Sequence, residues 1–149
     1  MSQLYDGSRA DKLYLRALNI REAHACGLWE PIMWHLALRG HVNAMVDLAH
    51  WLSESNTHRS LGIASDAFSA AGLYRRAYRR GDARAAYSLA MSYFNRNDMG
   101  GYRAWVTRAG RAGDGAAAAQ ARHFETRLPH GAARKIGRQR PEQKRDEFA

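Results

Sequence analysis

Cysteine is almost absent from this chain of 149 residues, in which Cys26 is the only one. A lone cysteine excludes an internal disulfide and a cysteine-rich zinc site, so packing must hold the fold together. Long apolar runs are also missing, and none approaches the roughly 20 residues that a membrane-spanning helix needs. Residues 1–10 lack the charged start and apolar stretch of a signal peptide. We therefore expect a cytoplasmic protein of bacterial type, with no membrane partner.

β-Branched residues are scarce between residues 11 and 128, where alanine, leucine and arginine dominate. This composition favours helices over strands, so the expected fold class is all-α. Glycine, proline and short polar stretches divide the segment into shorter pieces. The pattern predicts helices near 11–26, 31–39, 42–53, 65–80, 83–95, 101–112 and 116–128.

Three glycines mark an internal repeat. Gly40, Gly81 and Gly113 are spaced by 41 and 32 residues, within the range of helix-pair repeats. A small or apolar residue stands four positions before and four positions after each of them: Leu36 and Ala44, Ala77 and Ala85, Ala109 and Ala117. Small residues there let two antiparallel helices approach closely, and glycine can adopt the left-handed conformation that ends the first helix. Asp82 and Asp114 follow their glycines and are placed to cap the next helix.

One stretch of the repeat reads Leu73-Tyr74-Arg75-Arg76-Ala77 and continues with Gly81-Asp82, Ala85, Leu89 and Tyr93. It resembles the unit of the Sel-one-like repeat family, a relative of the tetratricopeptide repeat. Trp105, Ala109, Gly113, Asp114 and Ala117 follow the same pattern, and residues 32–52 follow it more loosely, with His41 in place of the aspartate. The resemblance implies a short right-handed αα-solenoid of about three helix pairs, with helix 11–26 as an N-terminal cap. It also implies an adaptor or scaffold role.

The formal charge of +9 is distributed unevenly. Residues 1–70 carry −1, residues 71–128 carry +7 and residues 129–149 carry +3, nearly all of the basic residues being arginine. Arginine makes planar bidentate contacts with carboxylates and phosphates, which suggests an acidic partner. A GC-rich genome that fills solvent positions with arginine is the alternative. We expect residues 1–128 to form the helical-repeat domain and residues 129–149 a basic, mobile tail.

Residue patterns for catalysis are missing. The seven histidines lack the i, i+4 spacing of a helical zinc site, and there is no nucleophile elbow or glycine-rich phosphate loop. We therefore expect no enzyme, no metal and no cofactor.

The remaining candidate functional residues lie on the expected surface of the helices. In the first helix of each pair, apolar residues form a stripe along one face, and other positions lie away from this stripe. In stacked repeats these other positions would align in one row, called here the ladder, with an aromatic end and a basic end. The candidate partner-binding residues on this ladder are Trp34, His35, Arg39, Arg75, Arg76, Arg79, Arg80, Arg108 and Arg111. Exposed tryptophan, histidine and arginine together resemble a protein-binding hot spot. The alternatives are a solvated basic face, and coverage of Trp34 and Leu38 by the N-terminal helix.

These observations predict a non-enzymatic protein-binding module with one dedicated partner that has an acidic surface. The partner would be a regulatory target, or a toxin that the chain neutralises as an immunity protein. The alternative function is nucleic-acid binding through the arginine-rich face and the tail. Against it, the aromatic residues that could stack on bases are assigned by the repeat to the core; these are Tyr74, Tyr78, Tyr102 and Trp105.

Overall fold

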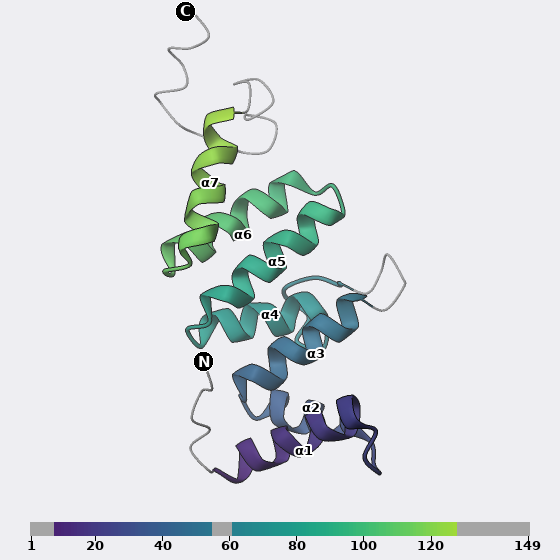
Figure 1. Cartoon of the computed structure of the whole chain (residues 1–149). Helices are drawn as coiled ribbons and strands as arrows, with labels where there is room; N and C mark the ends of the chain where they lie inside the picture. The colour runs from purple at the N-terminus through teal and green to yellow at the C-terminus, as the bar shows by residue number, and fades with distance from the viewer. Residues whose placement is uncertain (1–7, 55–60, 128–149) are drawn as a thin grey trace, which may run out of the picture. The chain divides into compact units, whose positions relative to one another are not determined.

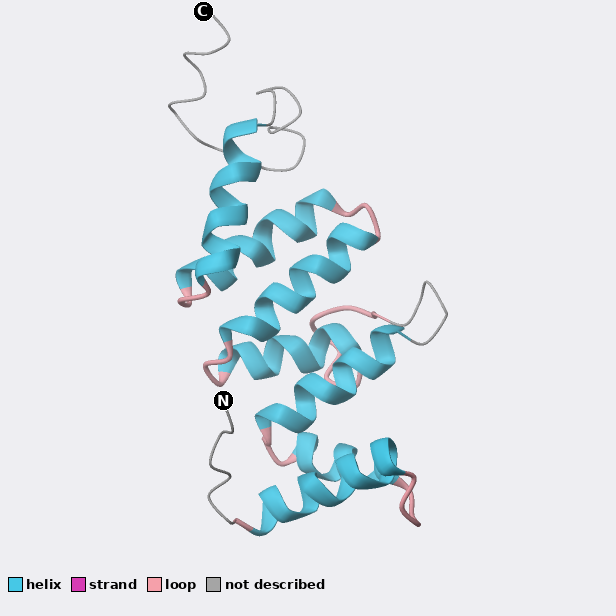
Figure 2. Ribbon diagram, viewed as in Figure 1, coloured by secondary structure: helices cyan, strands magenta, loops and turns pink. Residues whose placement is uncertain are grey.

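A computed structural model describes residues 8–54 and 61–127. Within these ranges the chain forms seven α-helices and no strand (Figures 1 and 2), which confirms the all-α prediction. The helices are α1 (Arg9–Ala23), α2 (Trp29–Leu38), α3 (Val42–Glu54), α4 (Ala70–Arg79), α5 (Ala83–Asn95), α6 (Met99–Arg111) and α7 (Gly115–Arg127). The tail predicted at residues 129–149 lies outside the described residues.

Two helix ends differ from the predicted bounds by three residues or more. The helix expected over 11–26 ends at Ala23, because His24 adopts a left-handed conformation with a φ of 54°. The helix expected from residue 65 begins at Ala70, where the Ser69 hydroxyl caps the backbone N–H of Gly72 at 3.0 Å. The preceding turn is packed so tightly that a Cβ at Gly72 would lie 1.7 Å from the carbonyl oxygen of Asp66. Local turn chemistry therefore overrides helix propensity at both places.

The helices fall into two compact units, divided between Arg80 and Gly81. In the first unit, α1 packs on α2, α2 on α3 and α3 on α4. In the second unit, α5 packs on α6 and α6 on α7.

The repeat predicted the core well. All three marker glycines have positive φ angles, of 93° at Gly40, 100° at Gly81 and 109° at Gly113. The small or apolar residues around them are buried: Leu36, Ala44, Ala77, Ala85, Ala109 and Ala117. As predicted, the carboxylates of Asp82 and Asp114 accept hydrogen bonds from backbone N–H groups of the following helix. The larger core side chains, such as Leu48 and Leu89, each contribute about 1.5–3 kcal/mol by leaving water.

Helices α6 and α7 make a close backbone contact. A Cβ at Gly110 of α6 would lie 2.8 Å from the Cα of Ala118 in α7, well inside the usual carbon–carbon separation of about 3.5–4.0 Å. The atom it would meet is backbone, so it cannot rotate away. An ion pair from Arg103 Nε to Glu125 Oε1 at 2.6 Å also joins the two helices.

We predict that Gly110→Ala destabilises the protein although alanine is the better helix former. The steric cost, about 1–3 kcal/mol, exceeds the gain in helix propensity, about 1 kcal/mol. Gly100→Ala in the same helix is the matched control, because its nearest new neighbour is Asp98 Oδ1 at 3.7 Å. Thermal denaturation should show a lower melting temperature for the Gly110 variant and an unchanged or higher one for the control. Equal melting temperatures would contradict the close contact.

Candidate functional site

Helix α2 divides its side chains between the core and the surface. Met33, Leu36 and Ala37 are buried. The next positions around the helix, His35, Leu38 and Arg39, are exposed, and Trp34 is half-buried. The exposed face of α2 thus has an aromatic side and a basic side, in contiguous positions of one helix.

The aromatic side is larger than the sequence indicated. The Trp34 ring lies 6.2 Å from the ring of Phe68, which precedes α4 and is 65% exposed. Leu38, one turn after Trp34, is 47% exposed, so the alternative in which the N-terminal helix covers this residue is wrong. Phe68 was missed by sequence reasoning. Its signal was an aromatic residue two positions after Asp66, in a segment of small and polar residues.

The basic side opens into a groove between α1 and α2, called here the α1–α2 groove. Its volume is about 650 Å³, and its lining residues are Arg9, Ala10, Leu13, His35, Leu36, Arg39, Gly40 and His41. The apolar lining residues are buried or half-buried, whereas Arg9, His35 and Arg39 are exposed. Arg39 Nη1 donates a hydrogen bond to His35 Nδ1 at 2.8 Å. Arg9 was not predicted, although its i, i+4 spacing from Leu13 puts both on one face of α1.

Arg80 joins this region from α4. A Cβ at Gly40 would lie 2.4 Å from Arg80 Nη2, so the guanidinium rests on the bare backbone of the α2–α3 turn. Arg39 and Arg80 occupy the same position of the repeat, one residue before a marker glycine. The structure therefore brings two of the predicted residues to one turn of the first unit.

The other predicted arginines are distributed differently. Arg75 is half-buried and donates to the carbonyl oxygen of Ala64 at 3.3 Å, which ties α4 to the turn before it. Arg76 is half-buried and Arg79 is exposed. Arg108 and Arg111 are exposed and belong to the second unit, where the Arg108 guanidinium lies 4.5 Å from the centre of the Trp105 ring.

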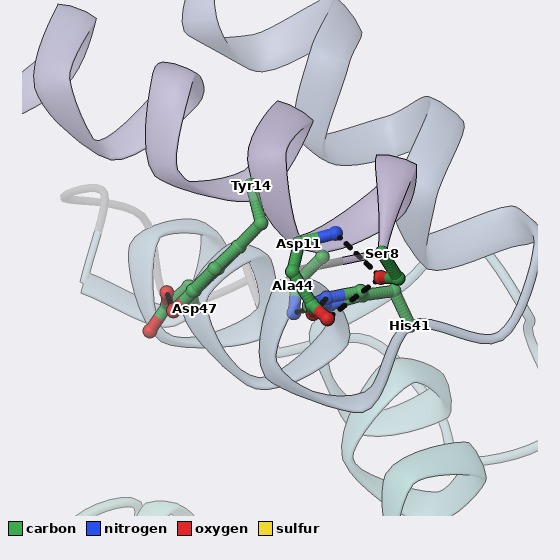
Figure 3. Close-up of polar contacts among 6 residues, drawn as sticks. All are labelled: Ser8, Asp11, Tyr14, His41, Ala44 and Asp47. Carbon is green, nitrogen blue, oxygen red and sulfur yellow. Dashed lines mark hydrogen bonds and ion pairs between the residues drawn. The ribbon is translucent and has the colours of Figure 1, made fainter. Parts of the chain in front are cut away.

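A polar network fixes α1 at the wall of the groove (Figure 3). His41 Nδ1 accepts a hydrogen bond from the backbone N–H of Ala44 at 3.2 Å, so the imidazole carries its proton on Nε2. That Nε2–H donates to Asp11 Oδ1 at 3.0 Å. Ser8, the N-cap of α1, donates to Asp11 Oδ2 at 2.6 Å, and the Tyr14 hydroxyl donates to the carboxylate of Asp47 in α3. His41 thus caps α3, as the aspartates do in the other pairs, and also holds α1.

The hydrogen bond from Ser8, followed by that from His41, lowers the pKa of Asp11 below its ordinary value of 3.8. Both bonds favour the ionised carboxylate. Asp11 is therefore a charged anchor whose two oxygens are both engaged within the protein.

Comparisons of the chain with family models, with curated proteins and with solved structures find no match. In residues 8–54 and 61–127, no three histidine, cysteine or acidic side chains are grouped so that they could hold a metal ion. None of the helices in these ranges has the length and apolar content needed to cross a membrane.

We predict that Asp11→Asn lowers the melting temperature at neutral pH and that the difference from the native chain disappears in acid. A carboxylate with a lowered pKa adds stability above its unfolded value of 3.8, and this stability is lost as the pH falls through the folded value. Melting curves between about pH 7 and about pH 2 test this. Glu22→Gln is the control, because Glu22 lies on the same helix and is 66% exposed. A difference that persists at the acid end would contradict the role assigned to Asp11.

Proposed function

We propose that the chain is a protein-binding module without catalytic activity, built as a short αα-solenoid of the Sel-one-like type, and that it binds one dedicated partner with an acidic surface. The observation that carries this proposal is the exposed face of α2. There Trp34, Leu38 and the neighbouring Phe68 adjoin His35 and Arg39, and Arg80 lies against the same turn. Aromatic anchors beside arginine are the side chains that dominate binding energy at protein interfaces.

Charge supports an acidic partner. Within the described residues, Arg9, Arg39 and Arg80 have no carboxylate at ion-pair distance, whereas Arg103 and Arg84 each have one. A guanidinium that is not paired inside its own protein keeps its donors for a ligand, and it matches the geometry of a carboxylate. A cluster of such groups also accelerates the encounter with a negatively charged surface.

The repeat supports the stacked arrangement and the type of function. Arg39 and Arg80 stand in equivalent positions of successive pairs and lie at the same turn, as the ladder of a solenoid requires. A regulatory target or a toxin neutralised by this chain would each present such a dedicated surface.

Nucleic-acid binding is the second candidate, favoured by the exposed Arg79, Arg108 and Arg111. Sequence-tolerant binding to single strands also needs aromatic rings on which bases can stack. Tyr74, Tyr102 and Trp105 are no more than 7% exposed, so their rings belong to the core, whereas Tyr78 is half-buried rather than buried as predicted. Trp34 and Phe68 are accessible, but they lie in the first unit, apart in sequence from Arg108 and Arg111.

We predict that reversing Arg39 and Arg80 to glutamate abolishes partner binding while stability changes by about 0.5 kcal/mol or less. Losing close charge pairs at an interface costs about 2–5 kcal/mol, which corresponds to roughly a 30-fold or greater loss of affinity. The partner would be captured from a nuclease-treated lysate of the source organism, identified, purified and titrated calorimetrically against each variant. Arg16→Glu, on an exposed position of α1 outside the groove, is the charge-matched control.

Capture that disappears with nuclease would favour the second candidate. In that case affinity for duplex DNA should fall with salt at a logarithmic slope near −0.9 for each phosphate contacted, and Trp34→Ala should have little effect. Retention of full affinity by the double reversal would contradict the assigned face.

A further inference from the structure

The α1–α2 groove combines two kinds of lining. Ala10, Leu13 and Leu36 provide apolar surface, and one arginine from each helix, Arg9 from α1 and Arg39 from α2, stands exposed beside it. A volume of about 650 Å³ lies within the usual range of ligand sites, about 300–1,000 Å³. The groove can therefore receive several side chains of a bound segment.

Within the described residues, neither arginine has a carboxylate at ion-pair distance. Asp11 is the acidic residue bound to the groove-lining His41, and Ser8 and His41 already engage its two oxygens. Arg39 uses Nη1 to contact His35, which orients its planar group and leaves its other N–H donors for a carboxylate. Arg9 lies in the first turn of α1, where the positive end of the helix dipole adds to its charge.

We propose that this groove binds an acidic, amphipathic segment of the partner protein, with an apolar side chain against Leu13 and Leu36 and carboxylates on Arg9 and Arg39. The inference rests on the proposed function and specifies the chemistry that the partner must present. A phosphate group or a nucleic-acid backbone would satisfy the arginines but leave the apolar lining in water. A purely apolar segment would leave two guanidiniums without a counter-ion. A segment with both features satisfies both parts of the groove.

The test uses a fluorescein-labelled peptide of repeated glutamate and leucine, and a matched peptide in which glutamine replaces glutamate. Fluorescence anisotropy with the full chain should show binding of the first peptide and binding at least about tenfold weaker for the second, because hydrogen bonds to charged groups are the stronger ones. Arg9→Ala and Arg39→Ala should each lower the affinity for the first peptide by a similar factor. Arg16→Ala should leave its affinity unchanged.

A second variant blocks the groove without altering charge. Ala10 is half-buried in α1 and lines the groove, so Ala10→Leu fills it from within while keeping a good helix former. We expect unchanged circular dichroism and melting temperature, and loss of peptide binding by about tenfold or more, because the leucine occupies the space of the peptide's apolar side chain.

Several results would overturn the inference: equal affinity for the two peptides, no binding of either, full binding by Ala10→Leu, or displacement of the peptide by duplex DNA at lower concentration than by unlabelled peptide. The inference about the groove can fail while the proposed function holds. If the captured partner loses affinity for the Arg39 and Arg80 double reversal but binds Ala10→Leu normally, the module still binds protein and the groove is not its site.

Discussion

The imidazole of His41 is bonded through both of its ring nitrogens, and the architecture around the groove depends on this arrangement. One nitrogen accepts from the backbone of α3 and the other donates to Asp11 of α1, so a single side chain ends a turn and fixes a neighbouring helix. A carboxylate could do only the first, because an ionised acid accepts hydrogen bonds and cannot donate them. An aspartate at this position would also place a second negative charge beside Asp11. The departure from the aspartate of the other two pairs thus has a physical reason.

A rigid wall matters for binding. Tyr14 and Asp11 attach α1 at two points one turn apart, to Asp47 and His41 respectively, and Ala17 on the same helix is fully buried. A groove with a preorganised wall would lose little conformational freedom on binding the proposed segment, so more of the contact energy would appear as affinity. The core contributes in the same direction, because alanine side chains in the helix contacts have no rotamers to reorganise.

Much of the fold could be predicted from residues whose effects are local. A glycine at the end of a helix, an aspartate after it and alanines four residues to either side predicted the turns and the buried contacts correctly. The errors arose where a turn competed with a helix, as at His24 and before Ala70, where hydrogen bonds of Ser69 and the close approach of Gly72 decide the outcome. Propensity cannot anticipate such a close approach.

The candidate site was predictable only in part. His35 and Arg39 follow from helix periodicity, and the equivalence of Arg39 and Arg80 follows from the repeat. Phe68 and Arg9 could not be found this way, because each reaches α2 from a segment whose path depends on the tertiary fold.

Gly40 has a consequence beyond its turn. Because it has no side chain, the Arg80 guanidinium can rest on the backbone at that point, and any larger residue would displace it. The position of a surface charge is therefore encoded 40 residues away from the charge itself, at a residue that carries no chemical group of its own. A substitution in this turn would therefore move the charge without changing the charged residue itself.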